Sequence, residues 1–202
     1  MPNQKSKKQL EKLKPEIIFW LKGNVTQKRF NHIARVAKTA KKYAKKLKLD
    51  QHKAELSGWL HDGAKEMTNL QLLRFAKKKK IKMDEVDFIN PHVLHARVGA
   101  VIAKERFNVK DPDVLGGIRC HTLAEPKMSR LMMTVYLADA TEPGRDKKRI
   151  SPIVKTFKKE GLETAVLEAI DQKLKEVISK GKVIHPFTIQ ARNWLVGKII
   201  LK

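Results

Sequence analysis

The sequence predicts an all-α protein, built as a single-domain helical bundle. Apolar residues recur at three- and four-residue steps along most of the chain, which is the spacing of a buried helix face. No segment alternates apolar and polar residues with the period of two that a strand needs, and no internal repeat or long linker divides the chain. The 202 residues are 42% hydrophobic, which is enough for one domain with a buried core.

Nine helices are expected. They follow a polar, lysine-rich segment at residues 1–14 that we expect to fray, so that the structured domain occupies residues 15–202. In chain order, the expected helices cover residues 16–21, 28–47, 51–60, 69–79, 91–106, 112–120, 127–138, 162–179 and 188–199.

Capping residues set the starts of the helices in the first half. Asp50 and Thr68 are N-cap residue types that precede the third and fourth helices. Pro91 and Pro112 open the next two, because proline fits the first turn of a helix. The helix over 28–47 carries one apolar stripe, and its lysines fall largely on the other side.

The second half contains the most apolar helix. Residues 127–138 are expected to be buried, and the Glu-Pro-Gly turn at 142–144 ends this helix. The helix over 162–179 is long and amphipathic, and Gly181 lies just beyond it, where glycine commonly terminates a helix.

The composition excludes several classes of protein. A single cysteine cannot form a disulfide scaffold or a Cys₄ or Cys₂His₂ zinc module. The longest apolar runs, such as residues 131–138, are far too short to cross a bilayer, and the polar N-terminus lacks the apolar stretch of a secretory signal. We therefore expect a soluble cytoplasmic protein with no membrane partner.

The chain is strongly basic, with 44 Lys plus Arg, 21 Asp plus Glu and a net charge of +23. Such an excess indicates either a polyanionic partner, such as RNA, DNA or a nucleotide, or lysines on solvated helix faces. The runs are almost all lysine, as at residues 77–80, and aromatic residues are not interleaved with them. We favour solvated faces for the bulk of the charge, and nucleic acid remains the alternative.

Four of the seven histidines stand beside apolar helix faces, namely His32, His61, His95 and His121. Asp62 directly follows His61, and Asp139 interrupts a buried apolar run. A carboxylate in such a run needs its charge compensated, and a metal ion with neutral imidazole ligands does this directly. Taken singly, each histidine is more simply a hydrogen-bonded core or surface residue, but the set together indicates a metal centre.

The remaining candidates are weaker. His52 and His185 are expected to have structural roles only. His92 lies three residues before His95 and could share its helix face as a second ligand. Cys120 could also bind a metal, although a lone cysteine is more often a small buried hydrophobe.

The order of His32, His61–Asp62 and Asp139 on separate helices resembles the H…HD…D pattern of the HD superfamily of metal-dependent phosphohydrolases. Longer segments resemble its YqeK family of symmetrical diadenosine tetraphosphate hydrolases. These segments are LHDGAKEM at 60–67, LHARVGA at 94–100, IRCHT at 118–122, MSRLMMTVYLADATEPGRD at 128–146 and HPFTIQARNWLV at 185–196. The resemblance runs from about residue 15 to residue 196, nearly the whole chain.

The resemblance implies a centre of two metal ions, most often iron, with manganese or zinc also suited to the ligands. Asp62 would bridge the two ions. One ion would be completed by His32, His61 and Asp139, and the other by His95 and His121.

The same resemblance assigns roles beside the metals. Arg145 would contact phosphate, the alternative being a salt bridge to Glu142 or Asp146. Lys65 would face the phosphates, the alternative being one more surface lysine, and it joins Asp62 and Arg145 as the expected catalytic set. The substrate contacts would come from His32, His95, His121, Thr122, Asp139, Arg145 and Phe187.

Two residues carry an explicit alternative. Phe187 would stack on adenine or serve as a core aromatic. Glu142 would either form a salt bridge with Arg145 or orient a metal ligand as a hydrogen-bond acceptor.

The resemblance therefore implies a hydrolase that cleaves diadenosine tetraphosphate symmetrically into two ADP, through attack by a metal-bridged hydroxide. The alternatives are an HD-domain nucleotidase acting on mononucleotides and a basic RNA-binding protein on an HD scaffold. Two departures from the family, at residues 122–126 and at Arg192, bear on substrate preference more than on metal binding. The sequence leaves open the native metal, the preferred dinucleotide, a homo-oligomeric state and the role of the lysine-rich N-terminus.

Overall fold

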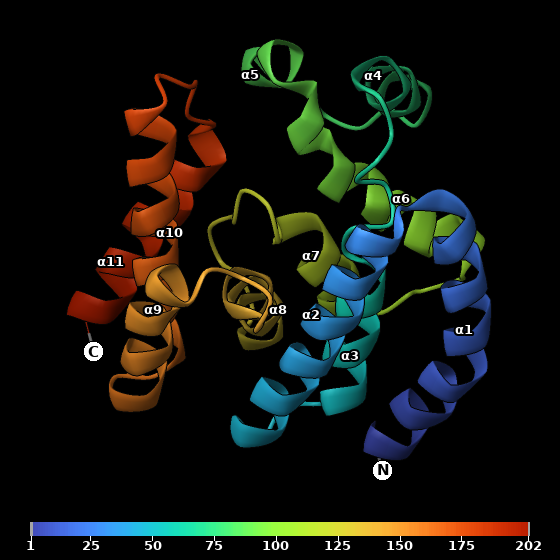
Figure 1. Ribbon diagram of the computed structural model, residues 1–202, viewed down its shortest axis with the longest axis horizontal. Helices are drawn as coiled ribbons and strands as arrows, with labels where there is room; N and C mark the ends of the chain where they lie inside the picture. The colour runs from blue at the N-terminus through green and yellow to red at the C-terminus, as the bar shows by residue number, and fades with distance from the viewer. Residues whose placement is uncertain (1, 202) are drawn as a thin grey trace.

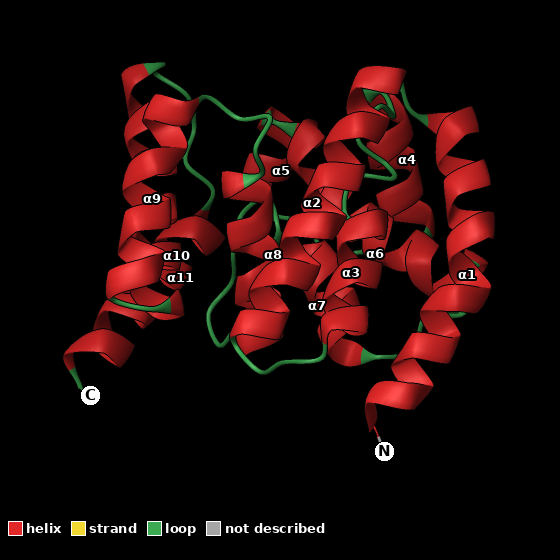
Figure 2. Ribbon diagram, turned by 60° about the horizontal axis from the view of Figure 1, so that its bottom comes forward, coloured by secondary structure: helices red, strands yellow, loops and turns green. Residues whose placement is uncertain are grey.

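The computed structural model describes residues 2–201, and these residues form helices and loops without a strand. Figure 1 shows their arrangement, and Figure 2 shows that only loops join the helices. The all-α prediction is confirmed. The elements are α1 Pro2–Asn24, α2 Gln27–Lys46, α3 Gln51–Leu60, α4 Asn69–Lys78, α5 Glu85–Ile89, the 3₁₀ helix η1 Pro91–Leu94, α6 His95–Arg106, α7 Pro112–Cys120, α8 Arg130–Thr141, α9 Lys147–Lys159, α10 Leu162–Ser179 and α11 Pro186–Ile200.

Four helices make the centre of the bundle. They are α2, α3, α7 and α8. The helices α3 and α8 pack on each other, and both α2 and α7 pack on each of them. α1 covers α3 on one side, and α9, α10 and α11 stand on the other side, where α10 packs on α8 (Figure 1). The core follows this division. One buried cluster joins α1–α3 with α6 and α7, and a second joins α8 with α9–α11.

Gly58 lets two central helices approach closely. A Cβ at this position of α3 would lie 2.6 Å from Cα of Ala37 in α2, closer than carbon atoms can pack. The approach matters for the site, because His32 lies on α2 and His61 follows the last residue of α3.

Most expected helices are present, with shifted ends. α10 has the expected bounds, and Asp50 and Thr68 cap α3 and α4 through side-chain hydrogen bonds. The helix expected over 91–106 begins with a 3₁₀ turn, and α8 begins after its N-cap Ser129.

Three features differ from expectation. α1 is helical from Pro2 onward, through the segment expected to fray, and Leu10 within it is buried against the core. α5 and α9 were not predicted. α5 has only 5 residues. In α9 an internal proline, Pro152, and a high lysine content mask the apolar face of Ile153 and Phe157.

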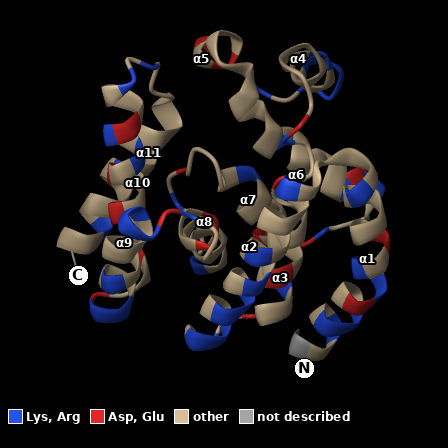
Figure 3. Ribbon diagram, in the orientation of Figure 1, with Lys and Arg blue, Asp and Glu red and all other residues tan. Residues whose placement is uncertain are grey.

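Two surface properties follow. The lysines at 77, 78 and 80 are exposed, as expected of a solvated helix face, and blue segments mark such positions on α1, α2, α4 and α9 in Figure 3.

Within residues 2–201, every helix is too short or too polar to cross a membrane.

Candidate metal centre

Six side chains converge near the middle of the bundle, and they are the six that the sequence predicted as ligands. They come from helices and from the turns that directly follow them: His32 on α2, His61 and Asp62 after α3, His95 at the start of α6, His121 after α7 and Asp139 near the end of α8. All are buried except Asp139, which is partly exposed.

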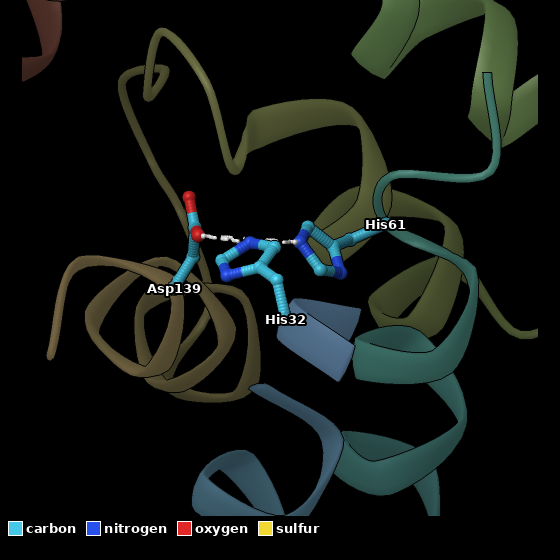
Figure 4. A group of neighbouring side chains, drawn as sticks. All are labelled: His32, His61 and Asp139. Atoms are coloured by element: carbon cyan, nitrogen blue, oxygen red, sulfur yellow. Dashed lines mark hydrogen bonds and ion pairs between the residues drawn. The ribbon is translucent and has the colours of Figure 1, made fainter. Parts of the chain in front are cut away.

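His32, His61 and Asp139 form one half of the site (Figure 4). Nε2 of His32 lies 3.1 Å from Oδ1 of Asp139 and 3.4 Å from Nε2 of His61. Nε2 of His61 lies 4.0 Å from the same carboxylate oxygen. Three potential ligand atoms therefore surround one point.

His95 and His121 form the other half. Their Nε2 atoms lie 3.1 Å apart, and each lies 3.3 Å from Oδ1 of Asp62. The hydroxyl of Thr122 lies 3.0 Å from both Nε2 atoms.

Asp62 joins the two halves through its two oxygens. Oδ1 faces His95 and His121, whereas Oδ2 lies 3.6 Å from Nε2 of His32 and 3.5 Å from Nε2 of His61. This is the arrangement of a carboxylate placed to share two cations.

The hydrogen bonds of the imidazoles fix which nitrogens face the centre. Nδ1 of His61, His95 and His121 each lies 2.5–2.7 Å from the carbonyl oxygen three residues earlier in the chain. A carbonyl only accepts, so each Nδ1 carries the hydrogen and each neutral ring presents an unprotonated Nε2 to the centre. His32 is held in the same way by the Glu142 carboxylate.

The converging Nε2 atoms need a cation between them. Burial lowers the pKa of His61 and of His95 to about 4, so these rings are neutral near pH 7. Arg29 donates to Oδ2 of Asp62 at 2.8 Å, and this positive charge favours the ionised form of the Asp62 carboxylate. Neutral imidazoles that point lone pairs at ionised carboxylates are a donor set that fits divalent metal ions.

Comparison with protein families agrees with this geometry. A family model described as HD domain matches residues 29–144, which is more than half of the chain. The chain belongs to the HD domain family. This membership implies dependence on divalent metal, and the matched range contains all six converging residues.

Relatives of this HD domain protein confirm the resemblance seen in the sequence. It is 32% identical over 176 residues to a symmetrical bis(5'-nucleosyl)-tetraphosphatase of Halalkalibacterium halodurans, covering 87% of this chain and 93% of the relative. It is 30% identical over 182 residues to the Bacillus subtilis protein of the same name, covering 90% and 97%. A solved structure from Clostridium acetobutylicum, described as a "predicted HD superfamily hydrolase involved in NAD metabolism", matches with a TM-score of 0.87 and 33% identity, covering 91% of this chain and 97% of that one.

Arg145 pairs most closely with Asp139, which the sequence did not suggest, and more distantly with Glu142, which it did. Its Nη2 donates to Oδ1 of Asp139 at 2.5 Å, and its Nε lies 4.0 Å from Glu142, while no ion pair joins it to Asp146 among the described residues. The guanidinium therefore already lies at the edge of the HD centre, beside a residue expected to bind metal.

Lys65 and Arg29 bring further positive charge to the centre. Nζ of Lys65 lies 3.3 Å from Nε2 of His95, and Arg29 donates to Oδ2 of Asp62 at 2.8 Å. Arg29 was not predicted, although it lies one turn before His32 on the same face of α2.

A cavity of about 330 Å³ opens beside these residues. Its lining includes the expected Asp62, Lys65, His121, Thr122, Asp139 and Arg145. It also includes residues that the sequence did not single out, namely Arg29, Tyr136, Ala140, Arg149, Ala169, Lys173 and Glu176. A cavity with this many cations suits a polyanionic ligand.

The structure does not bring Phe187 to this cavity. Phe187 lines a separate hollow with Val101 and Leu115, and the guanidinium of Arg97 lies 5.9 Å from its ring centroid. Its stacking on adenine remains a prediction.

His185 is buried in a second cluster of ionisable groups, with Asp84 and Asp87. Its Nδ1 accepts a hydrogen bond from the backbone N–H of Phe187 and so caps α11. Arg97 pairs with Asp87 and balances the charge there, so a structural role accounts for this cluster.

His92 and Cys120 lie outside the three groups of potential ligands found among the described residues. His92 contributes its carbonyl to His95 instead. Burial raises the pKa of the Cys120 thiol to about 12, which keeps it protonated and unsuited to binding a metal.

Proposed function

We propose that the protein hydrolyses diadenosine tetraphosphate symmetrically, to give two ADP. The observation that carries the proposal is the position of Asp62, whose two oxygens face two separate histidine pairs beside a strongly basic cavity. The names of the relatives with about 30% identity over most of the chain supply the substrate.

The residues that would hold two metal ions are those of the two half-sites. Asp62 would bridge, His32, His61 and Asp139 would complete one ion, and His95 and His121 the other. When bound, such ions act as Lewis acids on phosphoryl oxygens and lower the pKa of water. We propose iron as the native metal, and manganese and zinc suit the same nitrogen and oxygen donors.

Three groups of the protein itself would act on the phosphate chain. Arg145 presents a planar guanidinium at Asp139, and in the complex it would donate to a phosphoryl oxygen where negative charge develops. Lys65 and Thr122 flank His95 and would donate to the same phosphoryl group.

The protonation states of these groups suit the task. Burial lowers the pKa of Lys65 although Asp62 opposes this, and the side chain is a donor at a place where few waters compete. The Arg145 guanidinium stays charged, because Asp139 and Glu142 raise its pKa against the effect of burial.

The position of cleavage tests the proposal. Diadenosine tetraphosphate has three bridging bonds between its phosphates, and only the central one yields ADP alone. We expect ADP as the sole initial nucleotide product when the metal-loaded protein is incubated with this substrate and the products are separated by ion exchange. Equal amounts of AMP and ATP would refute symmetrical cleavage. Dephosphorylation of mononucleotides without cleavage of the dinucleotide would place the protein among nucleotidases.

A further inference from the structure

The central cavity reaches beyond the predicted site to α9 and α10. Its lining there includes Arg149 of α9 and Lys173 and Glu176 of α10, together with Tyr136 of α8. Figure 1 shows these helices on the side of α8 away from α3, and α10 packs directly on α8. The metal-facing residues and these four side chains therefore border one continuous space.

Among the described residues, the ion pair of Lys173 is a long one. Oε2 of Glu176 lies 3.8 Å from Nζ of Lys173. That acid is already engaged by Arg149, at 3.0 Å, and by Lys180, at 2.7 Å. Burial, together with the nearby Arg149 and Arg145, lowers the pKa of Lys173, whereas Glu176 and Asp139 oppose this change.

Tyr136 presents a hydroxyl with no partner among the described residues. It lies one turn before Asp139 on the same face of α8, and it is 5% exposed. Burial and the neighbouring Asp139 raise its pKa, so the phenol keeps its proton and is able to donate it to a ligand in the cavity.

We propose that Arg149, Lys173 and Tyr136 form a second phosphate subsite, which binds the phosphate next to the one held at the metal centre. The subsite deepens the proposed function and rests on it for the identity of the substrate. Its ligand is a nucleoside diphosphate unit, either as half of the dinucleotide or as the product ADP.

The chemistry of the three donors fits this ligand. Arginine offers a planar pair of N–H donors, lysine a mobile point charge and tyrosine a neutral O–H, and together they match the oxygens of one phosphate. Arg145 lies beside Asp139 at the metal centre, so the single phosphate of AMP can bind there without contacting α10. The subsite therefore distinguishes ADP from AMP.

Equilibrium binding of ADP and of AMP to the metal-loaded protein tests the subsite by isothermal titration calorimetry. We expect Lys173→Ala to raise the Kd for ADP about 10-fold, since it removes one charge-assisted bond, and to change the Kd for AMP less than about 2-fold. Arg149→Ala should act in the same direction, and Tyr136→Phe more weakly. Lys158→Ala, which removes an exposed charge from α9, is the matched control and should leave both constants unchanged.

The folding of each variant is checked by its thermal midpoint, and Lys173→Gln, which keeps the aliphatic stem, repeats the test if Lys173→Ala is unstable. An equal loss of ADP and AMP affinity, or no loss for ADP, would overturn the subsite. Binding needs no turnover, so the two proposals can fail separately. Dependence of ADP binding on Lys173 without hydrolysis of diadenosine tetraphosphate would refute the function and support the subsite. Hydrolysis to ADP with binding insensitive to Lys173 would refute the subsite alone.

Discussion

Nδ1 of His32 donates a hydrogen bond to Oε1 of Glu142 at 3.1 Å, and this contact joins two residues that are 110 positions apart in the chain. The same buried carboxylate accepts from Nε of Arg35 at 2.5 Å and from the backbone N–H of Gly144 at 2.6 Å. Glu142 is therefore fixed on three sides. It holds the imidazole of His32 with Nε2 toward the centre.

Replacing Glu142 should loosen this orientation. We expect Glu142→Gln to lower metal affinity by about 10–100-fold, which is typical when a partner behind a histidine ligand is lost. Metal retained after dialysis against increasing chelator, measured by mass spectrometry, checks the effect. Glu160→Gln makes the same change at an exposed position and should behave as wild type. Retention by Glu142→Gln equal to that of wild type would contradict the role of Glu142.

The close approach of α2 and α3 can be tested with two glycines. Gly58→Ala would place a Cβ 2.6 Å from Cα of Ala37, and we expect a loss of about 1–3 kcal/mol in the free energy of unfolding, as for other overpacked cores. Gly23→Ala, in α1, meets no atom within 4 Å and should be neutral or stabilising by up to about 1 kcal/mol. Urea unfolding of both variants checks this prediction. Equal changes in the free energy of unfolding would show that the close approach of Gly58 to Ala37 leaves no room problem for an added Cβ.

Stability should depend on pH through His61 and His95. Both rings are buried, which lowers each pKa to about 4 in the folded protein, whereas an unfolded histidine has a pKa of about 6.5. Between these values the unfolded chain binds more protons, so the free energy of unfolding of the metal-free protein falls as the pH drops from about 6.5 to about 4.

Urea unfolding of the chelator-treated protein at about pH 7 and about pH 5 measures this dependence. The variant His61→Gln/His95→Gln lacks both titrating rings and should show a smaller change over the same window. An unfolding midpoint that is the same at both pH values in the parent protein would mean that the two rings are not buried in neutral form.

The helices that the sequence predicted best are those with an unbroken apolar period and a clear stop. α10 has both, since its apolar face is continuous and Gly181 follows it with a φ of 59°. α9 has the apolar face of Ile153 and Phe157 and the N-cap Asp146, but Pro152 in its interior is a sequence signal for a break. Pro152 stands in the second turn of α9 and removes one backbone N–H from the helix, but Ile153 and Phe157 are buried in the core and stabilise the helix beyond it.

Some residues of the site could likewise be predicted from the sequence and others could not. The six converging residues were predicted because histidines and acids on apolar faces are unusual, and because they match a family pattern. Arg29 lies on the same helix face as His32, and that spacing could have identified it. Arg149 and Lys173 could not be identified in this way, because their place in the cavity depends on which faces of α9 and α10 pack toward α8.

The metal content of Asp62→Ala tests the central claim, that Asp62 bridges two ions, most directly. The purified wild-type protein should hold two metal ions per chain by inductively coupled plasma mass spectrometry. Asp62→Ala should lose metal from both sites, because it removes the oxygens that face both histidine pairs, whereas His95→Ala should lose mainly one ion and Glu160→Gln neither. Near-normal metal content in Asp62→Ala would contradict the bridged centre.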